Sequence, residues 1–274
     1  MTELSLKERA LRGKKLSDLL IIDARGICPA IDGDPFSTAL KGMIQMLDNV
    51  GVAKVVLVSF LGLGSGEPML GNRDVEKVVD SYPERFYGWF AFNPNFSEIT
   101  QEIIEEWLRK QGFIGIKIQP NFNKYPVNGK EYARVWEAAA KMRAPVLGHS
   151  WNNNRYCDPA LFAEVAASYP SVPVILAHSG GTREGYIRTV EFAQERKNMY
   201  LELCRVDFSY GQVEYFVKEV GVQRVIYGTD FCPGYIDFRP ALGNILFAKV
   251  SDEDKKKILG LNMKTIIENI EKQG

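Results

Sequence analysis

The stretch KVVLVSF at residues 54–60 is an almost continuous run of apolar and β-branched residues. A second run of the same kind, PVILAH, occupies residues 173–178. Uninterrupted apolar runs of this length are typical of strands in a parallel sheet that is covered on both faces. We therefore expect a sheet whose strands are joined through helices rather than through tight hairpin turns.

Outward from these two runs, strand patterns and amphipathic helical patterns alternate along the chain. The expected strands are residues 19–24, 54–60, 86–92, 115–119, 144–149, 172–178, 199–204 and 225–229. The expected helices are residues 38–49, 72–81, 99–110, 129–142, 159–168, 183–196, 211–219 and 238–248. Eight such strand–helix units predict a (β/α)8 TIM barrel that forms one domain over residues 1–274, with further helices at 251–260 and 262–272 packed outside it.

The alternative to a barrel is a doubly wound open sheet, which should carry a glycine-rich phosphate turn after an early strand. The stretch GLGSG at residues 62–66 does follow the second expected strand. It lacks the spacing of a dinucleotide-binding turn, and no helix pattern starts directly after it. We interpret it as a flexible loop of the barrel.

Composition excludes several classes of protein. The chain has 34 Lys and Arg against 34 Asp and Glu, and this zero net charge argues against a nucleic-acid partner. It contains neither an apolar run long enough to span a membrane nor a secretory signal pattern. The four cysteines form no close pair typical of a disulfide framework. We expect a cytoplasmic protein with no membrane partner.

Histidine is unusually scarce, since the chain has only two, His149 and His178. Both lie where an expected strand ends, and Asp230 follows the eighth strand. In a barrel of this type the functional site lies at the carboxyl ends of the strands, so these three side chains should meet. Imidazole and carboxylate groups serve both as zinc ligands and as general acids or bases.

Seven motifs occur in an order and at a spacing that resemble a known family. They are IIDARG at residues 21–26, GIKIQP at 115–120, PVLGHS at 145–150, VILAHSGG at 174–181, NMYLELC at 198–204, YGTDFCP at 227–233 and KILGLNMKTII at 257–267. The sequence resembles the amidohydrolase-related metal-dependent hydrolases, in the amidohydrolase 2 branch that includes aminocarboxymuconate semialdehyde decarboxylase. The resemblance extends over nearly the whole chain.

The resemblance implies one divalent metal at the barrel mouth, for which zinc is our expectation. The family's metal ligands are a His-x-His at the first strand, a histidine on the fifth and an aspartate on the eighth. The family's sixth-strand histidine activates the metal-bound water. Carried over, the fifth-strand ligand is His149, the sixth-strand histidine is His178 and the eighth-strand carboxylate is Asp230. The His-x-His is replaced by Arg25 and Ile27, and Gln119 stands where the family often has a fourth-strand histidine.

Three hypotheses follow from this replacement. In the first, His149, His178, Asp230 and water still hold a metal, with Cys28 or Cys232 as a possible thiolate substitute for a lost ligand. In the second, the Arg25 guanidinium replaces the charge of the metal, and His178 and Asp230 act as acid and base in a metal-independent lactonase or decarboxylase. In the third, the barrel binds a ligand without turning it over.

Further polar residues follow strands on the expected mouth side. The candidates for substrate binding are Arg155, Arg183, Arg205, Gln119 and Trp151, and Lys117 shares the orientation of Gln119. Several arginines around one mouth, in a chain without net charge, predict an anionic substrate such as a carboxylate. We therefore expect a hydrolase or lyase that acts on a small carboxylated molecule, with His178, Asp230 and Arg25 as its catalytic residues. A homodimer is expected from the habit of the family.

Overall fold

The structure is a computed structural model that describes residues 4–29, 36–64, 66–204, 210–232, 237 and 239–271. Its eight parallel strands form one sheet in the order β1 to β8. The strands are β1 Ile22–Ile27, β2 Lys54–Val58, β3 Phe86–Phe92, β4 Phe113–Ile118, β5 Val146–His149, β6 Val174–Ala177, β7 Met199–Glu202 and β8 Val225–Ile226. This arrangement confirms the predicted (β/α)8 barrel.

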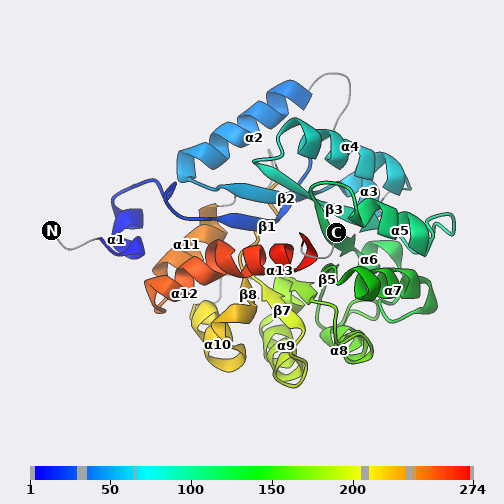
Figure 1. Cartoon of the computed structure of the whole chain (residues 1–274). Helices are drawn as coiled ribbons and strands as arrows, with labels where there is room; N and C mark the ends of the chain where they lie inside the picture. Colours follow the sequence, from blue (N-terminus) through cyan, green and yellow to red (C-terminus); the bar gives the residue numbers. More distant parts are fainter. Residues whose placement is uncertain are drawn as a thin grey trace.

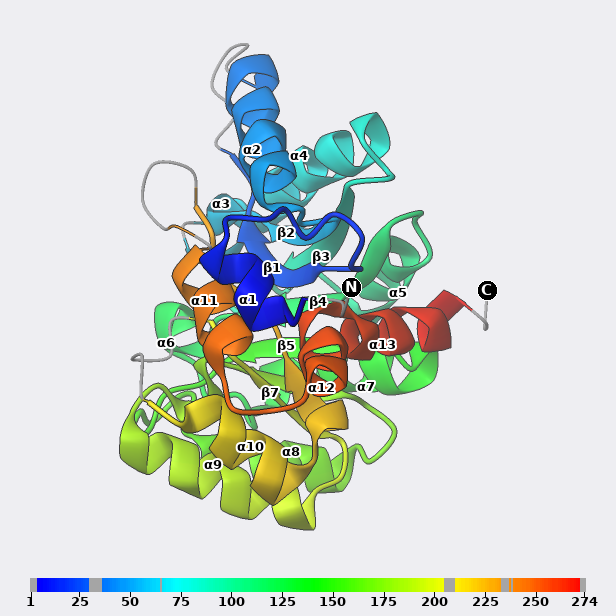
Figure 2. The same cartoon turned by 90° about the vertical axis from the view of Figure 1, so that its left-hand side faces the viewer.

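The helices surround the strands, and Figures 1 and 2 show them as an outer layer. They are α1 Leu6–Leu11, α2 Phe36–Val50, α3 Phe60–Gly64, α4 Pro68–Ser81, α5 Gln101–Leu108, α6 Pro120–Asn123, α7 Ala133–Met142, α8 Pro159–Ser168, α9 Arg183–Glu195, α10 Gln212–Val220, α11 Arg239–Phe247, α12 Asp252–Lys256 and α13 Asn262–Glu271. Short turns of other helix types occur at Lys130–Tyr132, His178–Gly180, Val222–Arg224 and Lys257–Leu261.

The barrel closes where β1 meets the segment that follows β8. Gly26 pairs with Phe231 in an isolated bridge, and the Ile27 N–H donates to the Phe231 carbonyl at 2.7 Å. The Asp230 N–H donates to the Arg25 carbonyl at 2.9 Å across the same seam. Two residues that are 205 positions apart in the chain therefore become neighbours only because the barrel closes.

Apolar side chains fill the barrel interior, as in other barrels of this type. Trp89 is fully buried there, and its indole N–H donates to the Ala24 carbonyl at 2.8 Å. Met263, Ile266 and Ile267 of α13 belong to the same buried cluster as Ile22 and Ile114, which lie at the starts of β1 and β4. Helix α13 thus covers the barrel end opposite the strands' carboxyl ends, which leaves the other end for the site.

The observed elements differ from the expected ones at several boundaries. The strand expected at 19–24 is observed three residues later, because Arg25, Gly26 and Ile27 still pair along the barrel. The segment expected to be a flexible loop instead begins with helix α3, which directly follows β2. Strand β6 ends at Ala177, so His178 lies in the turn after the strand. None of the helices in the described ranges is long and apolar enough to cross a membrane.

Candidate active site

A bulge turns the side chain of Arg25 into the barrel mouth. The pairing of β1 with β2 shifts register between Asp23 and Gly26, and bulges of this kind re-aim the side chains that follow. Ala24 and Ile27 both belong to the interior cluster, although regular alternation would send them to opposite faces. The alternation therefore changes phase at the shift, and Arg25 turns inward together with Ile27.

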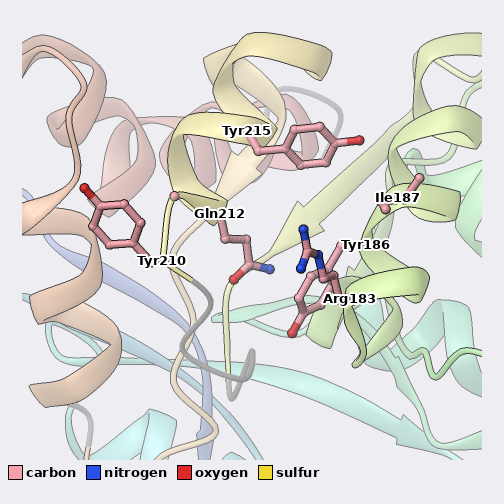
Figure 3. Close-up of a pocket in the computed structure, with 7 residues that line it drawn as sticks. Arg183, Tyr186, Ile187, Tyr210, Gln212 and Tyr215 are labelled. Carbon is pink, nitrogen blue, oxygen red and sulfur yellow. The ribbon is translucent and has the colours of Figure 1, made fainter.

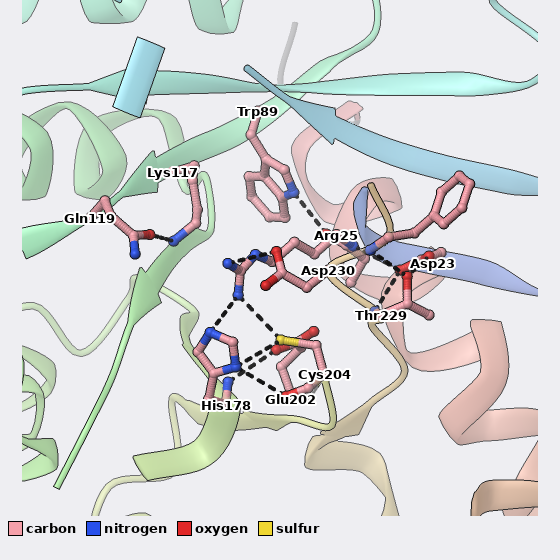
Figure 4. Close-up of polar contacts among 12 residues, drawn as sticks. Asp23, Arg25, Trp89, Lys117, Gln119, His178, Glu202, Cys204, Thr229 and Asp230 are labelled. Carbon is pink, nitrogen blue, oxygen red and sulfur yellow. Dashed lines mark hydrogen bonds and ion pairs between the residues drawn. The ribbon is translucent and has the colours of Figure 1, made fainter. Parts of the chain in front are cut away.

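The Arg25 guanidinium lies between two of the residues expected to act in catalysis (Figure 4). Its Nη1 lies 3.0 Å from His178 Nε2 and 3.2 Å from Cys204 Sγ, and its Nη2 lies 2.9 Å from Asp230 Oδ1. All four side chains are buried. Burial opposes the charge of Arg25, but the Asp230 carboxylate and the Cys204 thiol raise its pKa above the usual value. The site therefore contains a fixed cation.

The contacts of His178 define its tautomer. Its Nδ1 lies 3.1 Å from the backbone oxygen of Cys204, which can only accept, so Nδ1 carries the proton. Nε2 then accepts the hydrogen bond from Arg25. Burial lowers the pKa of His178 well below its usual value, and the charge of Arg25 lowers it further. His178 is thus a neutral imidazole whose lone pair is occupied, and it holds Arg25 in place.

Three non-glycine residues at the mouth have left-handed backbone conformations. They are His178 with φ 64°, Ser179 with φ 46° and Asp230 with φ 58°. Such conformations cost on the order of 1–3 kcal/mol each and persist where the surroundings impose them. Here the Ser179 hydroxyl donates to the Glu202 carbonyl at 2.9 Å, and the Asp230 N–H is tied to β1. Strain at two of the three expected catalytic residues is typical of a functional site.

His149 lies beside this cluster with its nitrogens free. Its ring stacks on Trp151 at 6.1 Å with an interplanar angle of 5°, and it meets the His178 ring edge-on at 4.7 Å. No hydrogen bond of His149 occurs among the described residues, and its Nδ1 is buried. Burial lowers the pKa of His149 well below its usual value, and the charges of Lys117 and Arg25 lower it further. His149 is therefore a neutral base with an available lone pair.

Lys117 places a buried amine at the same end of the barrel (Figure 4). Its Nζ donates to the Ile118 carbonyl at 2.8 Å and to Gln119 Oε1 at 3.0 Å. Burial, and then the charge of Arg25, lowers the pKa of Lys117 well below its usual value. The amide oxygen of Gln119 thus holds Lys117, and a contact of Gln119 with substrate stays a prediction.

Glu202 and Cys204 belong to the cluster, although the sequence analysis did not select them as site residues. Glu202 Oε2 accepts the backbone N–H of His178 at 3.2 Å, and a Cβ on Gly228 would collide with Glu202 Oε1. Burial raises the pKa of Glu202 and raises that of the Cys204 thiol well above its usual value. Their positions at the end of the seventh strand were the available signal, but the sequence offered no partner for either.

Asp23 supports the cluster from the seam. Its Oδ1 accepts the backbone N–H groups of Arg25 at 3.0 Å and Thr229 at 3.1 Å, and the Thr229 hydroxyl donates to Oδ2. The carboxylate therefore binds β1 to the segment after β8. It fixes the backbone of Arg25 and the residue that precedes Asp230.

The metal that the resemblance implied does not fit this arrangement. The guanidinium of Arg25 has no lone pair to offer a metal, and it lies between His178 Nε2 and Asp230 Oδ1. The part of the chain that the structure describes contains no group of three or more His, Cys, Asp or Glu side chains placed to hold a metal ion. Cys28 and Cys232, the possible thiolate substitutes, belong to no such group among the described residues either. We derive no step through a metal.

The residues expected to bind substrate do not all meet. Trp151 is about one-third exposed and stacks on His149 at the mouth. Arg155 is exposed and lies over the ring of Tyr156, 4.6 Å from its centroid. Arg183 lines a separate pocket on the outside of the barrel. Arg205 lies outside the described residues.

A family model described as Amidohydrolase matches residues 52–263, and the chain belongs to this amidohydrolase 2 family. Solved structures match it closely in fold. They include an uncharacterized TIM-barrel protein from Bordetella bronchiseptica, with a TM-score of 0.72 at 18% identity over 92% of this chain and 100% of that one. They also include 5-carboxyvanillate decarboxylase from Sphingomonas paucimobilis, with a TM-score of 0.69 at 15% identity over 91% and 99%.

A related structure carries a metal. It is 5-carboxyvanillate decarboxylase from Novosphingobium aromaticivorans complexed with manganese and a nitrobenzoic acid, with a TM-score of 0.69 at 14% identity over 92% of this chain and 97% of that one. At such identities the likeness concerns the fold. A divalent metal is thus known among structural neighbours, whereas in this chain a guanidinium lies between two of the three side chains that the resemblance assigned to metal chemistry.

Proposed function

We propose that this chain is an enzyme of the amidohydrolase family that acts on a small carboxylated molecule without a resident metal. Its reaction is hydrolysis of an ester or lactone bond. One observation carries the proposal: the Arg25 guanidinium is held between His178 Nε2 and Asp230 Oδ1. We keep the cytoplasm as the expected compartment, in keeping with the four free cysteines.

Arg25 supplies the positive charge at which a carbonyl oxygen can become an oxyanion. Guanidinium has five N–H groups, and the buried Nε of Arg25 has no hydrogen-bond partner among the described residues. The charge is permanent and pre-oriented by three neighbours, so it needs no reorganisation when the transition state forms. Because Arg25 is already paired with Asp230, a substrate anion has to share or displace that contact.

His149 is the base in this proposal, which differs from the role expected for His178. The lone pair of His178 accepts from Arg25, whereas His149 makes no hydrogen bond among the described residues. Asp230 is held by its ion pair with Arg25, and its Oδ1 makes no hydrogen bond within the described part of the chain, so this carboxylate can orient the attacking water. His178 is assigned a positioning role through its bond to Arg25.

The hydrolytic step consumes one water molecule. The water oxygen attacks the carbonyl carbon while His149 takes one of its protons, and the new oxyanion faces Arg25. The bond from that carbon to the leaving oxygen then breaks. The leaving oxygen takes the proton from His149, so a carboxylic acid and an alcohol form and the base is regenerated.

Decarboxylation is the second candidate, because several solved structures with this fold are decarboxylases of carboxylated aromatics. A guanidinium bound to the carboxylate that is lost as carbon dioxide would stabilise the negative charge of that group and so oppose the reaction. Decarboxylation would therefore require Arg25 to hold another oxygen of the substrate. For this reason the cluster favours hydrolysis.

The test is an activity screen in the presence of a chelator. The purified protein is assayed on carboxylated esters and lactones and on aromatic carboxylates, and acid release and carbon dioxide are measured separately. We expect turnover that EDTA does not change. Arg25→Met should lower kcat by about 10²–10³, as loss of an oxyanion donor does, and Arg25→Lys should retain part of the activity.

Lys218→Met serves as the control, because it removes an exposed cation of α10 outside the cluster. Thermal melts of each variant separate loss of chemistry from loss of fold. Turnover that EDTA abolishes and manganese or zinc restores would overturn the proposal. So would a folded Arg25→Met variant with full activity. Saturable binding of a carboxylate with no turnover across the panel would favour the ligand-binding barrel instead.

A further inference from the structure

A pocket of about 450 Å³ opens between the first turns of α9 and α10, outside the Arg25 cluster (Figure 3). Its lining residues are Arg183, Tyr186, Ile187, Tyr210, Gly211, Gln212 and Tyr215. None of them contacts Arg25, His178 or Asp230 in the cluster described above. Both helices follow strands, so the pocket lies on the mouth side of the barrel but at its periphery.

The pocket offers positive charge and backbone donors. Arg183 is the first residue of α9 and is exposed, and it makes no hydrogen bond or ion pair within the described part of the chain. Helix α10 begins after Gly211, which provides no side-chain cap for its first N–H groups. Uncapped N–H groups at a helix start favour anions.

Gln212 provides an independent sign of a ligand. Its side chain is 8% exposed, and its amide Nε2 is buried with no hydrogen-bond partner among the described residues. In Figure 3 the Gln212 amide points into the pocket, and the Arg183 side chain extends toward it from α9. A buried donor without an acceptor is unfavourable, and an incoming acceptor would remove that penalty.

The other walls are aromatic and apolar. Tyr186 is buried, Tyr215 is half-buried, and Ile187 is exposed at the rim. Among the described acids, Glu214 accepts the backbone N–H of Lys249 at 2.6 Å, and Glu184 is next to Arg183 in the sequence. Glu219 and Glu191 act on Tyr215, since their charges add to burial in raising the pKa of its hydroxyl. One cation with one amide donor matches a carboxylate, and the ring surfaces match a planar apolar body rather than a bare phosphate.

We propose that this pocket is a second binding site, for a small aromatic monocarboxylate. The carboxylate binds between the Arg183 guanidinium and the Gln212 amide, and the ring lies against Tyr186, Ile187 and Tyr215. This site is independent of the function proposed for the Arg25 cluster, because the two share no residue.

The test uses sodium benzoate as the probe, with binding followed by calorimetry. The wild type should bind with a Kd of about 1 mM or tighter. Arg183→Met should weaken binding about 10-fold or more, and Gln212→Leu about 3–10-fold, in line with charged and neutral hydrogen bonds. Lys218→Met, which also removes one exposed cation of α10, should leave the affinity unchanged.

A second measurement locates the binding. Fluorine NMR of protein labelled with 3-fluorotyrosine should show the Tyr186 and Tyr215 signals shifting with benzoate, each assigned by its Tyr→Phe variant. Equal binding by the wild type, Arg183→Met and Gln212→Leu would overturn the proposal. So would the absence of saturable binding at about 10 mM. Inorganic phosphate that binds as tightly as benzoate and displaces it would show a phosphate site and overturn the choice of an aromatic carboxylate.

Discussion

Arg25 lies near the end of β1 and Arg183 begins the helix after β6, at the same end of one barrel, yet their surroundings differ in nearly every respect. Arg25 is 2% exposed and contacts His178, Cys204 and Asp230. Arg183 is exposed and has no polar partner among the described residues. Arg25 was expected to be catalytic, and Arg183 was expected to bind the same substrate. Of these two arginines, only the one that the fold buries has polar partners among the described residues.

The difference also separates two kinds of site. In the Arg25 cluster the polar groups are paired with one another, so a ligand has to compete with existing contacts. In the outer pocket the Arg183 guanidinium and the Gln212 Nε2 have no polar partner among the described residues, so a ligand adds contacts at little cost. Substitutions should therefore affect stability at the inner site and affinity at the outer one.

The largest expected effect is the loss of Arg25. Arg25→Met leaves the Asp230 carboxylate buried without its countercharge, and breaking such a pair costs about 3–5 kcal/mol. Urea unfolding measures this loss. The matched substitution Arg183→Met should change the unfolding free energy by no more than about 0.5 kcal/mol. Equal effects at the two positions would contradict the distinction between the two arginines.

The second prediction concerns packing beneath the cluster. Gly228→Ala forces a methyl group against the Glu202 carboxyl and should destabilise the fold by about 1–3 kcal/mol. Gly243→Ala on α11 is the control, because a Cβ there meets open space and alanine favours a helix. Thermal unfolding of both variants compares them. Equal stability of the two variants would mean that the Glu202 carboxyl can move away from the added methyl group, which would contradict this prediction.

The third prediction concerns pH. Burial, with the charge of Arg25, lowers the pKa values of His149 and His178 below 6.5, so the folded state resists protons that the unfolded chain accepts. Their contribution to stability is complete above about pH 6.5 and is lost as the pH falls through the folded pKa values. His178→Asn should reduce the loss between about pH 6.5 and pH 5.5 by about 1 kcal/mol, measured by urea unfolding. A pH dependence identical to that of the wild type would contradict the neutral His178 assigned here.

The smallest expected effect is that of added metal. Zinc or manganese should leave the melting temperature of the wild type unchanged, since a ligand stabilises only a protein that binds it. Arg25→His removes the guanidinium and adds an imidazole, so this variant should gain a metal-dependent rise in melting temperature. Calorimetric melts with EDTA or metal compare the two proteins. A rise in the wild type as large as in the variant would show that Arg25 does not exclude the ion.

Much of the fold could be predicted from the sequence, because apolar runs and amphipathic periods are local signals. The runs at residues 54–60 and 173–178 mark β2 and β6 to within a few residues. The boundary errors come from tertiary pairing: β1 extends past residue 24 because the seam with the segment after β8 continues there. Helix α3 was missed because glycines give a weak helical signal.

The candidate site was predicted in part. Strand ends identified Arg25, His149, His178 and Asp230, which do gather at the mouth. Their roles could not be predicted, because which nitrogen of His178 carries the proton depends on its contacts with the Cys204 carbonyl and with Arg25. Glu202 was overlooked, since its contact with the His178 backbone joins neighbouring strands and leaves no trace in either local sequence.

The sequence by itself determined that this chain forms an eightfold barrel and that it lacks the first-strand histidine pair of its family. Both properties follow from residue types and their hydrophobic periodicity, which are set along the chain before any tertiary contact forms. Only the tertiary structure decided what replaces that pair. A bulge in β1 and closure of the barrel bring Arg25 against residues about 150 to 205 positions away, as the separations of its partners require. Burial then makes one arginine a fixed cation and leaves another open to a ligand.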